Sequence, residues 1–154
     1  MTRVDSSLGT LLRTLIDALD GDVERAYAQA GLDFRPRFTP VVRLLAAEGA
    51  LRIKDLASCM GISHSAVSQT VGQLVAQGWV RLEPGADGRE RVARLTPQAL
   101  AALPELQRCW AATARAADAL DAELGLDLEE VVRGAVAALQ RQSFLARIAE
   151  ADAS

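Results

Sequence analysis

The clearest candidate for chemistry is a stretch between Ser63 and Gln77 that contains no Asp, Glu, Lys or Arg, although 24% of the chain is charged. Val67, Val71 and Leu74 fall within about 60° of one another at ~100° per residue, so the stretch predicts a helix with one apolar face. The opposite face presents Ser65, Gln69, Gly72, Gln73 and Ala76. Glutamine pairs with adenine in a major groove, and small residues let a helix backbone approach the bases. The stretch therefore predicts a helix that reads bases. The alternative is a helix that only packs against the core and has an outer face without a binding role.

Two short alternating segments follow, Val80–Leu82 and Arg91–Leu95, and they predict paired strands. The residues between them, Pro84–Gly88, are typical of a turn. Three arginines lie just beyond this tip: Arg89, Arg91 and Arg94. An arginine at such a tip can enter a minor groove, where a narrow A-T tract concentrates negative potential. A hairpin with solvated arginines is the alternative.

The residues before the uncharged stretch predict a first helix and a tight turn. Ile53, Leu56, Ala57 and Met60 fall on one helical face. Gly61 suits a left-handed cap, Ile62 is expected to enter the core beneath the turn, and Ser63 is a good N-cap for the next helix. Helix, turn, helix and hairpin together outline a winged helix-turn-helix, with His64 at the first position of the second helix.

Residues for other chemistry are sparse. His64 is the only histidine, and Cys59 and Cys109 lie 50 residues apart without CxxC spacing, so we expect no metal site. Nucleotide-binding and nucleophile-elbow motifs do not occur, which predicts neither an enzyme nor a cofactor. His64 is a candidate DNA contact, or else a simple exposed residue. Oxidation of Cys59 in the first helix of the motif would disturb DNA binding, which leaves a redox switch as an alternative.

The predicted helices at both ends of the chain contain more apolar residues than the core of this small module needs. An apolar stripe covers residues 8–19, where Gly21 is expected to interrupt it, and the pattern resumes to Gly31 before a connector at 32–38. Thr39 as N-cap and Pro40 as first helical residue predict a short helix that ends near Gly49. Thr96 and Pro97 open a long helix, divided or kinked at Pro104 and ended by Gly125, and Asp127 caps a last helix through Ile148. These terminal helices predict a dimerisation domain, with packing inside one monomer as the alternative.

Length and charge are consistent with one soluble DNA-binding domain. The chain has 154 residues and a net charge of −3. Residues 52–95 carry six basic and four acidic side chains, whereas residues 96–154 carry five and nine. Only the winged segment is net basic, which would orient it toward DNA. No apolar run reaches the ~18 residues of a membrane span, and no signal peptide is apparent, so we expect a cytoplasmic protein.

The winged segment also resembles a known family. Asp55-Leu56-Ala57, Gly61-Ile62-Ser63, Val67-Ser68-Gln69, Gly78-Trp79-Val80, Asp87-Gly88-Arg89 and Leu95-Thr96 are similar to the MarR family of bacterial transcriptional regulators. Two features depart from the family pattern. Gly88 stands where an Arg or Lys is common, and Gln69 and Gln73 stand in a helix that often carries basic residues.

The resemblance implies a mainly α fold with a small β-hairpin wing, in three parts: an N-terminal dimerisation helix and connector at 1–38, a winged helix-turn-helix at 39–96, and C-terminal dimerisation helices at 97–154. It implies a homodimeric regulator, usually a repressor, that binds an inverted repeat in double-stranded DNA, with a small-molecule effector as a further partner that releases it. The expected DNA contacts are Ser63, His64, Ser65, Ser68, Gln69, Gln73, Arg89 and Arg91. The expected effector pocket is lined by Tyr27, Phe38 and Trp110. A winged-helix module that docks a protein instead of DNA remains the main alternative.

Overall fold

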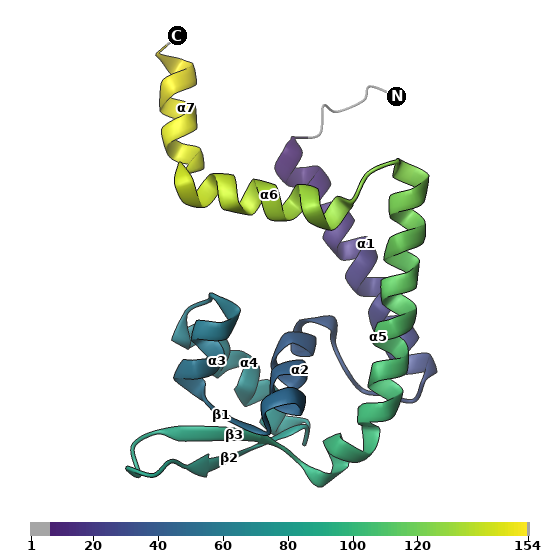
Figure 1. The fold of residues 1–154 in the computed structure, drawn as a ribbon, viewed down its shortest axis with the longest axis vertical. Helices are drawn as coiled ribbons and strands as arrows, with labels where there is room; N and C mark the ends of the chain where they lie inside the picture. The colour runs from purple at the N-terminus through teal and green to yellow at the C-terminus, as the bar shows by residue number, and fades with distance from the viewer. Residues whose placement is uncertain (1–6, 154) are drawn as a thin grey trace. The chain divides into compact units, whose positions relative to one another are not determined.

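A computed structural model describes residues 7–153, which form helices and a small antiparallel sheet (Figure 1). Three strands pair in the order β1-β3-β2. The elements in chain order are α1 Leu8–Gln29, the 3-10 turn η1 Pro36–Phe38, α2 Thr39–Glu48, β1 Ala50–Arg52, α3 Ile53–Met60, α4 His64–Ala76, β2 Val80–Pro84, β3 Arg91–Leu95, α5 Pro97–Leu124, α6 Leu128–Arg141 and α7 Phe144–Asp152. Contacts between residues divide the described chain into two compact units, one that ends at Trp110 and one that begins at Ala111.

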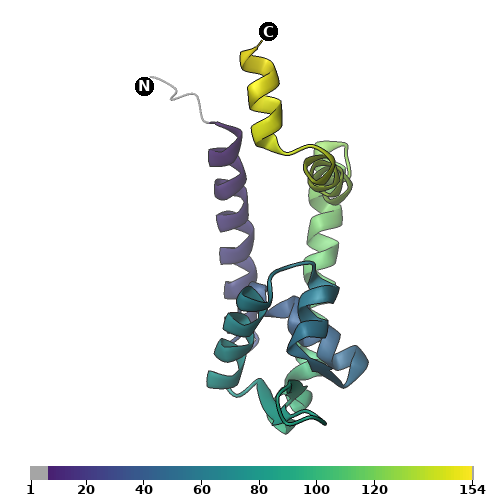
Figure 2. The same ribbon diagram turned by 90° about the vertical axis from the view of Figure 1, so that its left-hand side faces the viewer.

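The winged module is held by an apolar core between the sheet and the helices α2, α3 and α4, which lie on the same side of it (Figures 1 and 2). Each element contributes residues at the spacing its geometry requires, such as Leu56 from α3, Leu74 from α4 and Ala93 from β3, all 0% exposed. The register pairs Arg52 with Val92 and Val80 with Leu95, so the hairpin is fixed against the start of α3. The core thereby sets the position of α4 relative to the wing.

Several predicted local features are confirmed. Gly61 ends α3 in the left-handed region with φ of 64°, and the Ser63 side chain accepts the amide N–H of Ala66. Gly125 follows α5 with φ of 69°, and the Asp127 side chain accepts the N–H of Glu130 at the start of α6. These features depend on residues within four positions of one another, so the sequence pattern is sufficient to locate them.

Other expectations were wrong. Helix α1 runs through Gly21 without interruption, and Pro104 does not divide α5, which is continuous from Pro97 to Leu124. The predicted last helix is two helices, because Gln142 adopts extended geometry and Ser143 caps a new start. Ile62 is 43% exposed and does not enter the core.

Two more differences lie around the winged module. Strand β1 was not predicted, and it extends the expected hairpin to three strands. Thr39 is the first residue of α2 and not its cap, and its hydroxyl lies 3.3 Å from the hydroxyl of Tyr27. A three-residue strand is too short to show an alternating pattern of its own, so its existence depends on pairing with β3.

The unit Ala111–Ser154 leaves its apolar residues uncovered within the single chain. No residue of α6 or α7 is buried, and the exposed side chains include Val131, Val136, Phe144 and Ile148, each more than half exposed. The N-terminal part of α1 has the same character, with Leu8 68% and Leu11 56% exposed. Amphipathic helices with bare apolar faces need a covering surface.

Candidate nucleic-acid interface

Helix α4 displays its uncharged face to solvent. Val67, Val71 and Leu74 are fully buried, so the side chains on the other side of the helix point outward. Ser65, Ser68 and Gln69 are exposed, whereas Gln73 is only half-exposed. The predicted face is therefore available along the first two turns of α4, where a helix that enters a major groove contacts base edges.

The wing tip is built around the Asp87 carboxylate. Its Oδ1 accepts the backbone N–H groups of Glu90 and Arg89, both at 3.0 Å. Gly88 has φ of 71°, a backbone conformation that strongly favours glycine, and its N–H donates to Gly85 O at 3.0 Å. The glycine that departs from the family pattern thus fits the local turn geometry.

The Asp87 hydrogen bonds should make the wing tip resistant to acid. The amides of Glu90 and Arg89 stabilise the charged carboxylate and lower the pKa of Asp87 below its ordinary value. Because the folded pKa is depressed, this stabilisation is present above the unfolded pKa and is lost as the pH falls through the folded one. In an NMR pH series, we expect the amide signals of Arg89 and Glu90 to shift with a midpoint below the ordinary aspartate range. In the Asp87→Asn variant, this pH-dependent shift should disappear. A midpoint at or above that range would contradict this account.

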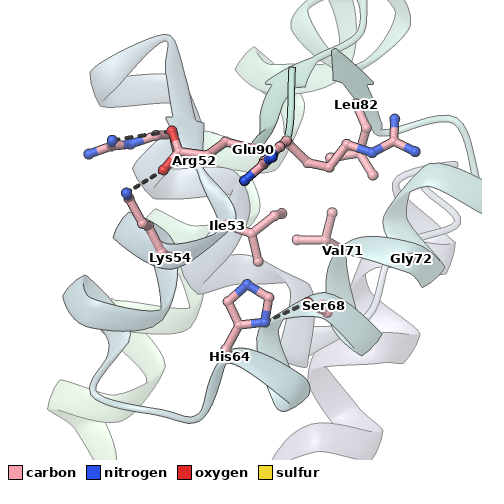
Figure 3. A pocket seen from close by; sticks show the side chains of 11 residues that line it. Arg52, Ile53, Lys54, His64, Ser68, Val71, Gly72, Leu82 and Glu90 are labelled. Atoms are coloured by element: carbon pink, nitrogen blue, oxygen red, sulfur yellow. Dashed lines mark hydrogen bonds and ion pairs between the residues drawn. The ribbon is translucent and has the colours of Figure 1, made fainter. Parts of the chain in front are cut away.

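The tip, α3 and α4 enclose a surface hollow of about 320 Å³ (Figure 3). Four of the eight predicted DNA-contact residues line it: His64, Ser68, Arg89 and Arg91. His64 Nδ1 lies 3.4 Å from Ser68 Oγ, and Ile53 and Val71 provide an apolar floor. The other four do not line the hollow: Ser65, Gln69 and Gln73 lie on α4, and Ser63 is its N-cap. The structure therefore places polar groups of the helix beside cations of the wing.

An ion-pair network on the same hollow was missed by sequence reasoning. Glu90, at the end of the tip, pairs with Lys54 and with Arg52, whose Nη1 lies 3.3 Å from Glu90 Oε2. Arg52 also forks onto Asp55, with contacts of 2.6 and 3.1 Å. These contacts lower the pKa of Glu90, with the Lys54 hydrogen bond as the main cause. Residues 36 and 38 positions apart give no local signal, and only the β1–β3 register brings them together.

The predicted effector residues are part of the core. Tyr27 is 1%, Phe38 0% and Trp110 8% exposed, and Trp110 Nε1 donates to the Tyr27 hydroxyl at 3.0 Å. They line neither the hollow described above nor the shallow one beside Glu24 and Asp33. Their role as an effector pocket stays a prediction.

The remaining candidates offer little further chemistry. Cys59 is exposed on α3, whereas Cys109 is buried. Within residues 7–153, no three or more His, Cys, Asp or Glu side chains gather into a group that could hold a metal ion. Among the described helices, none is both long and apolar enough to cross a membrane.

Comparisons with known proteins find a matching family and similar solved structures. Residues 38–90 match a model described as the MarR family. No curated protein sequence matches the chain significantly. Among solved structures, a probable transcriptional regulator from Pseudomonas aeruginosa is 22% identical, with 89% of this chain and 99% of that one covered and a TM-score of 0.64.

Two further structures are similar over nearly their whole length. The M. tuberculosis transcriptional regulator MOSR in complex with DNA is 21% identical, with a TM-score of 0.67 and coverage of 94% and 97%. The PcaV transcriptional regulator from Streptomyces coelicolor, in complex with its natural ligand, is 20% identical, with a TM-score of 0.65 and coverage of 93% and 99%. At these identities the likeness establishes the fold.

Proposed function

We propose that this protein, whose residues 38–90 match the MarR family, is a member of that family and acts as a sequence-specific, DNA-binding transcriptional regulator. The observation that supports this most is the uncharged, exposed face of α4 beside the arginines of the wing. A helix without carboxylates is not repelled by phosphates, and its serine and glutamine side chains can pair with base edges. The wing arginines supply contacts to the backbone or the minor groove.

We propose that the protein acts as a homodimer and, in the cell, as a repressor that occludes its operator. The uncovered apolar faces of α1 and of α6 and α7 are where a second copy would bind. A twofold dimer presents two α4 helices, which suits half-sites about one turn of DNA apart, ~34–36 Å. The predicted target is accordingly a short inverted repeat, and dimerisation would double a basic excess that is small in one chain.

The first test is fluorescence-anisotropy binding to DNA from upstream of the protein's own gene, compared with shuffled DNA across a salt series. Sequence-dependent binding that weakens steeply with salt would support the proposal, because such binding releases counterions. Light scattering on the same sample gives the number of chains bound. Absence of binding to every DNA at low salt would favour a module that docks a protein through the uncharged face of α4.

Base readout through Gln69 predicts a selective loss. Gln69→Ala should cost ~1 to 3 kcal/mol on the operator and little on shuffled DNA, because a bidentate amide–base contact discriminates between sequences whereas phosphate contacts do not. Gln107→Ala is the matched control, since Gln107 is an exposed glutamine on α5. Equal losses on operator and shuffled DNA would show that Gln69 does not read a base.

A further inference from the structure

The hollow between α4 and the wing contains one carboxylate among four cations. Of the side chains that line it, Arg52, Lys54, Arg89 and Arg91 are basic, and Glu90 is the acid (Figure 3). The first helix of a helix-turn-helix crosses the DNA backbone while the second enters the groove. A backbone strand that passes between α4 and the wing would thus meet the start of α3, where Lys54 lies. An acid at this place opposes the phosphates that the cations attract.

The two cations that face Glu90 are not equivalent. Arg52 keeps a second partner, because its guanidinium forks onto Asp55. For Lys54 the structure gives the Glu90 carboxylate as the ion-pair partner, and the lysine side chain is 54% exposed, so water and DNA can reach its ammonium group. The Glu90 side chain is only 28% exposed. Its backbone N–H is fixed by Asp87, so it cannot easily turn away from the hollow.

We propose that Lys54 forms a phosphate-binding site on the DNA face and that the Glu90 carboxylate occupies this site in place of a phosphodiester. While Glu90 holds Lys54, the lysine makes no phosphate contact, although the exposed pair itself is weak because water and salt screen it. The negative charge of Glu90 nonetheless stays in the interface and lowers the affinity for any DNA. Glu90 thereby restrains binding through the backbone, which has no sequence information, and leaves recognition to α4. This inference rests on the proposed DNA-binding function.

The test is the affinity of the full-length Glu90→Gln protein for the operator and for shuffled DNA across a salt series. Glutamine keeps the size of the side chain and removes its charge, which frees Lys54 for a phosphate. We expect binding to tighten on the order of tenfold on both DNAs, with the slope of log K against log salt more negative by about 0.9 per subunit. Their affinity ratio should not change. Adding Lys54→Met to Glu90→Gln should return the slope to that of the unmodified protein.

Glu83→Gln is the matched control, because it makes the same change in net charge within the same wing. Glu83 pairs with Arg81 at 3.1 Å and Arg94 at 3.6 Å and does not line the hollow. Glu83→Gln should give a smaller gain in affinity than Glu90→Gln. Adding Lys54→Met to Glu83→Gln should not change the slope of log K against log salt. An equal gain from Glu83→Gln would overturn the inference, since general electrostatics would then explain both variants.

The remaining outcomes separate the inference from the function on which it rests. If the unmodified protein binds DNA but Glu90→Gln binds no tighter, or binds more weakly while its thermal unfolding is unchanged, Glu90 only positions the wing and the inference is wrong. If neither protein binds any DNA at low salt, the proposed function fails and the inference fails with it. Thermal unfolding followed by circular dichroism shows whether each variant is folded.

Discussion

Arg89→Ala is expected to weaken DNA binding on operator and shuffled DNA alike, on the order of tenfold for a dimer at moderate salt. Arg89 is exposed at the wing tip and lines the hollow beside α4. Each phosphate contact that is lost should make the slope of log K against log salt less negative by about 0.9, and a dimer loses one from each subunit. Anisotropy titrations at several salt concentrations measure both quantities.

The structure allows this result to be separated from damage to the wing. Arg89 bonds to Asp87 through its backbone N–H and not through its side chain. Alanine keeps that N–H, so the turn at the wing tip should persist. Arg115→Ala on α5 is the control, because it removes the same charge from an exposed position outside the winged module. An unchanged salt slope in Arg89→Ala would exclude a phosphate contact through this side chain. A loss confined to targets with A-T-rich flanks would instead indicate insertion into a narrow minor groove.

Phe34→Ala should be the most destabilising of the substitutions considered, at about 3 to 5 kcal/mol. The Phe34 side chain is 2% exposed, and its ring centroid lies 5.1 Å from Tyr27, 5.7 Å from Phe38 and 4.9 Å from Trp79. Removing it opens a cavity and ends three edge-to-face ring contacts at once. Urea unfolding followed by circular dichroism measures the loss.

Phe34 also lies next to a hydrogen bond that joins two distant segments, so its loss should weaken both segments together. The neighbouring Asp33 carbonyl accepts the indole N–H of Trp79 at 3.1 Å, which ties the segment after α1 to the residue that precedes β2. Leu100→Ala is the control, because it trims an apolar side chain that is 53% exposed on α5 and should change the free energy of unfolding by less than ~0.5 kcal/mol. If the two variants unfold at similar urea concentrations, the aromatic cluster contributes little.

The sequence by itself determined the features that depend on neighbours within a few residues. Gly61, Ser63 and Asp127 set helix ends through hydrogen bonds to amides or carbonyls less than one turn away, so their residue types are sufficient. The α4 face follows from helical periodicity, and the strands β2 and β3 follow from alternation around a turn. The resemblance of the winged segment to the MarR family rests on the same kind of local motif, and residues 38–90 match that family.

Only the tertiary structure decided which distant groups meet. Phe34 lies in a segment that looked like a connector, and it is core because α1 and Trp79 converge on it. Glu90 meets Lys54 and Arg52 because β1 pairs with β3, a strand that the pattern did not reveal. Conversely, Gly21 does not interrupt α1 and Pro104 does not divide α5, because the backbone hydrogen bonds of each long helix outweigh one unfavourable residue. Local preferences are worth about 1 kcal/mol for a glycine, whereas contacts between elements sum over many residues and determine the result.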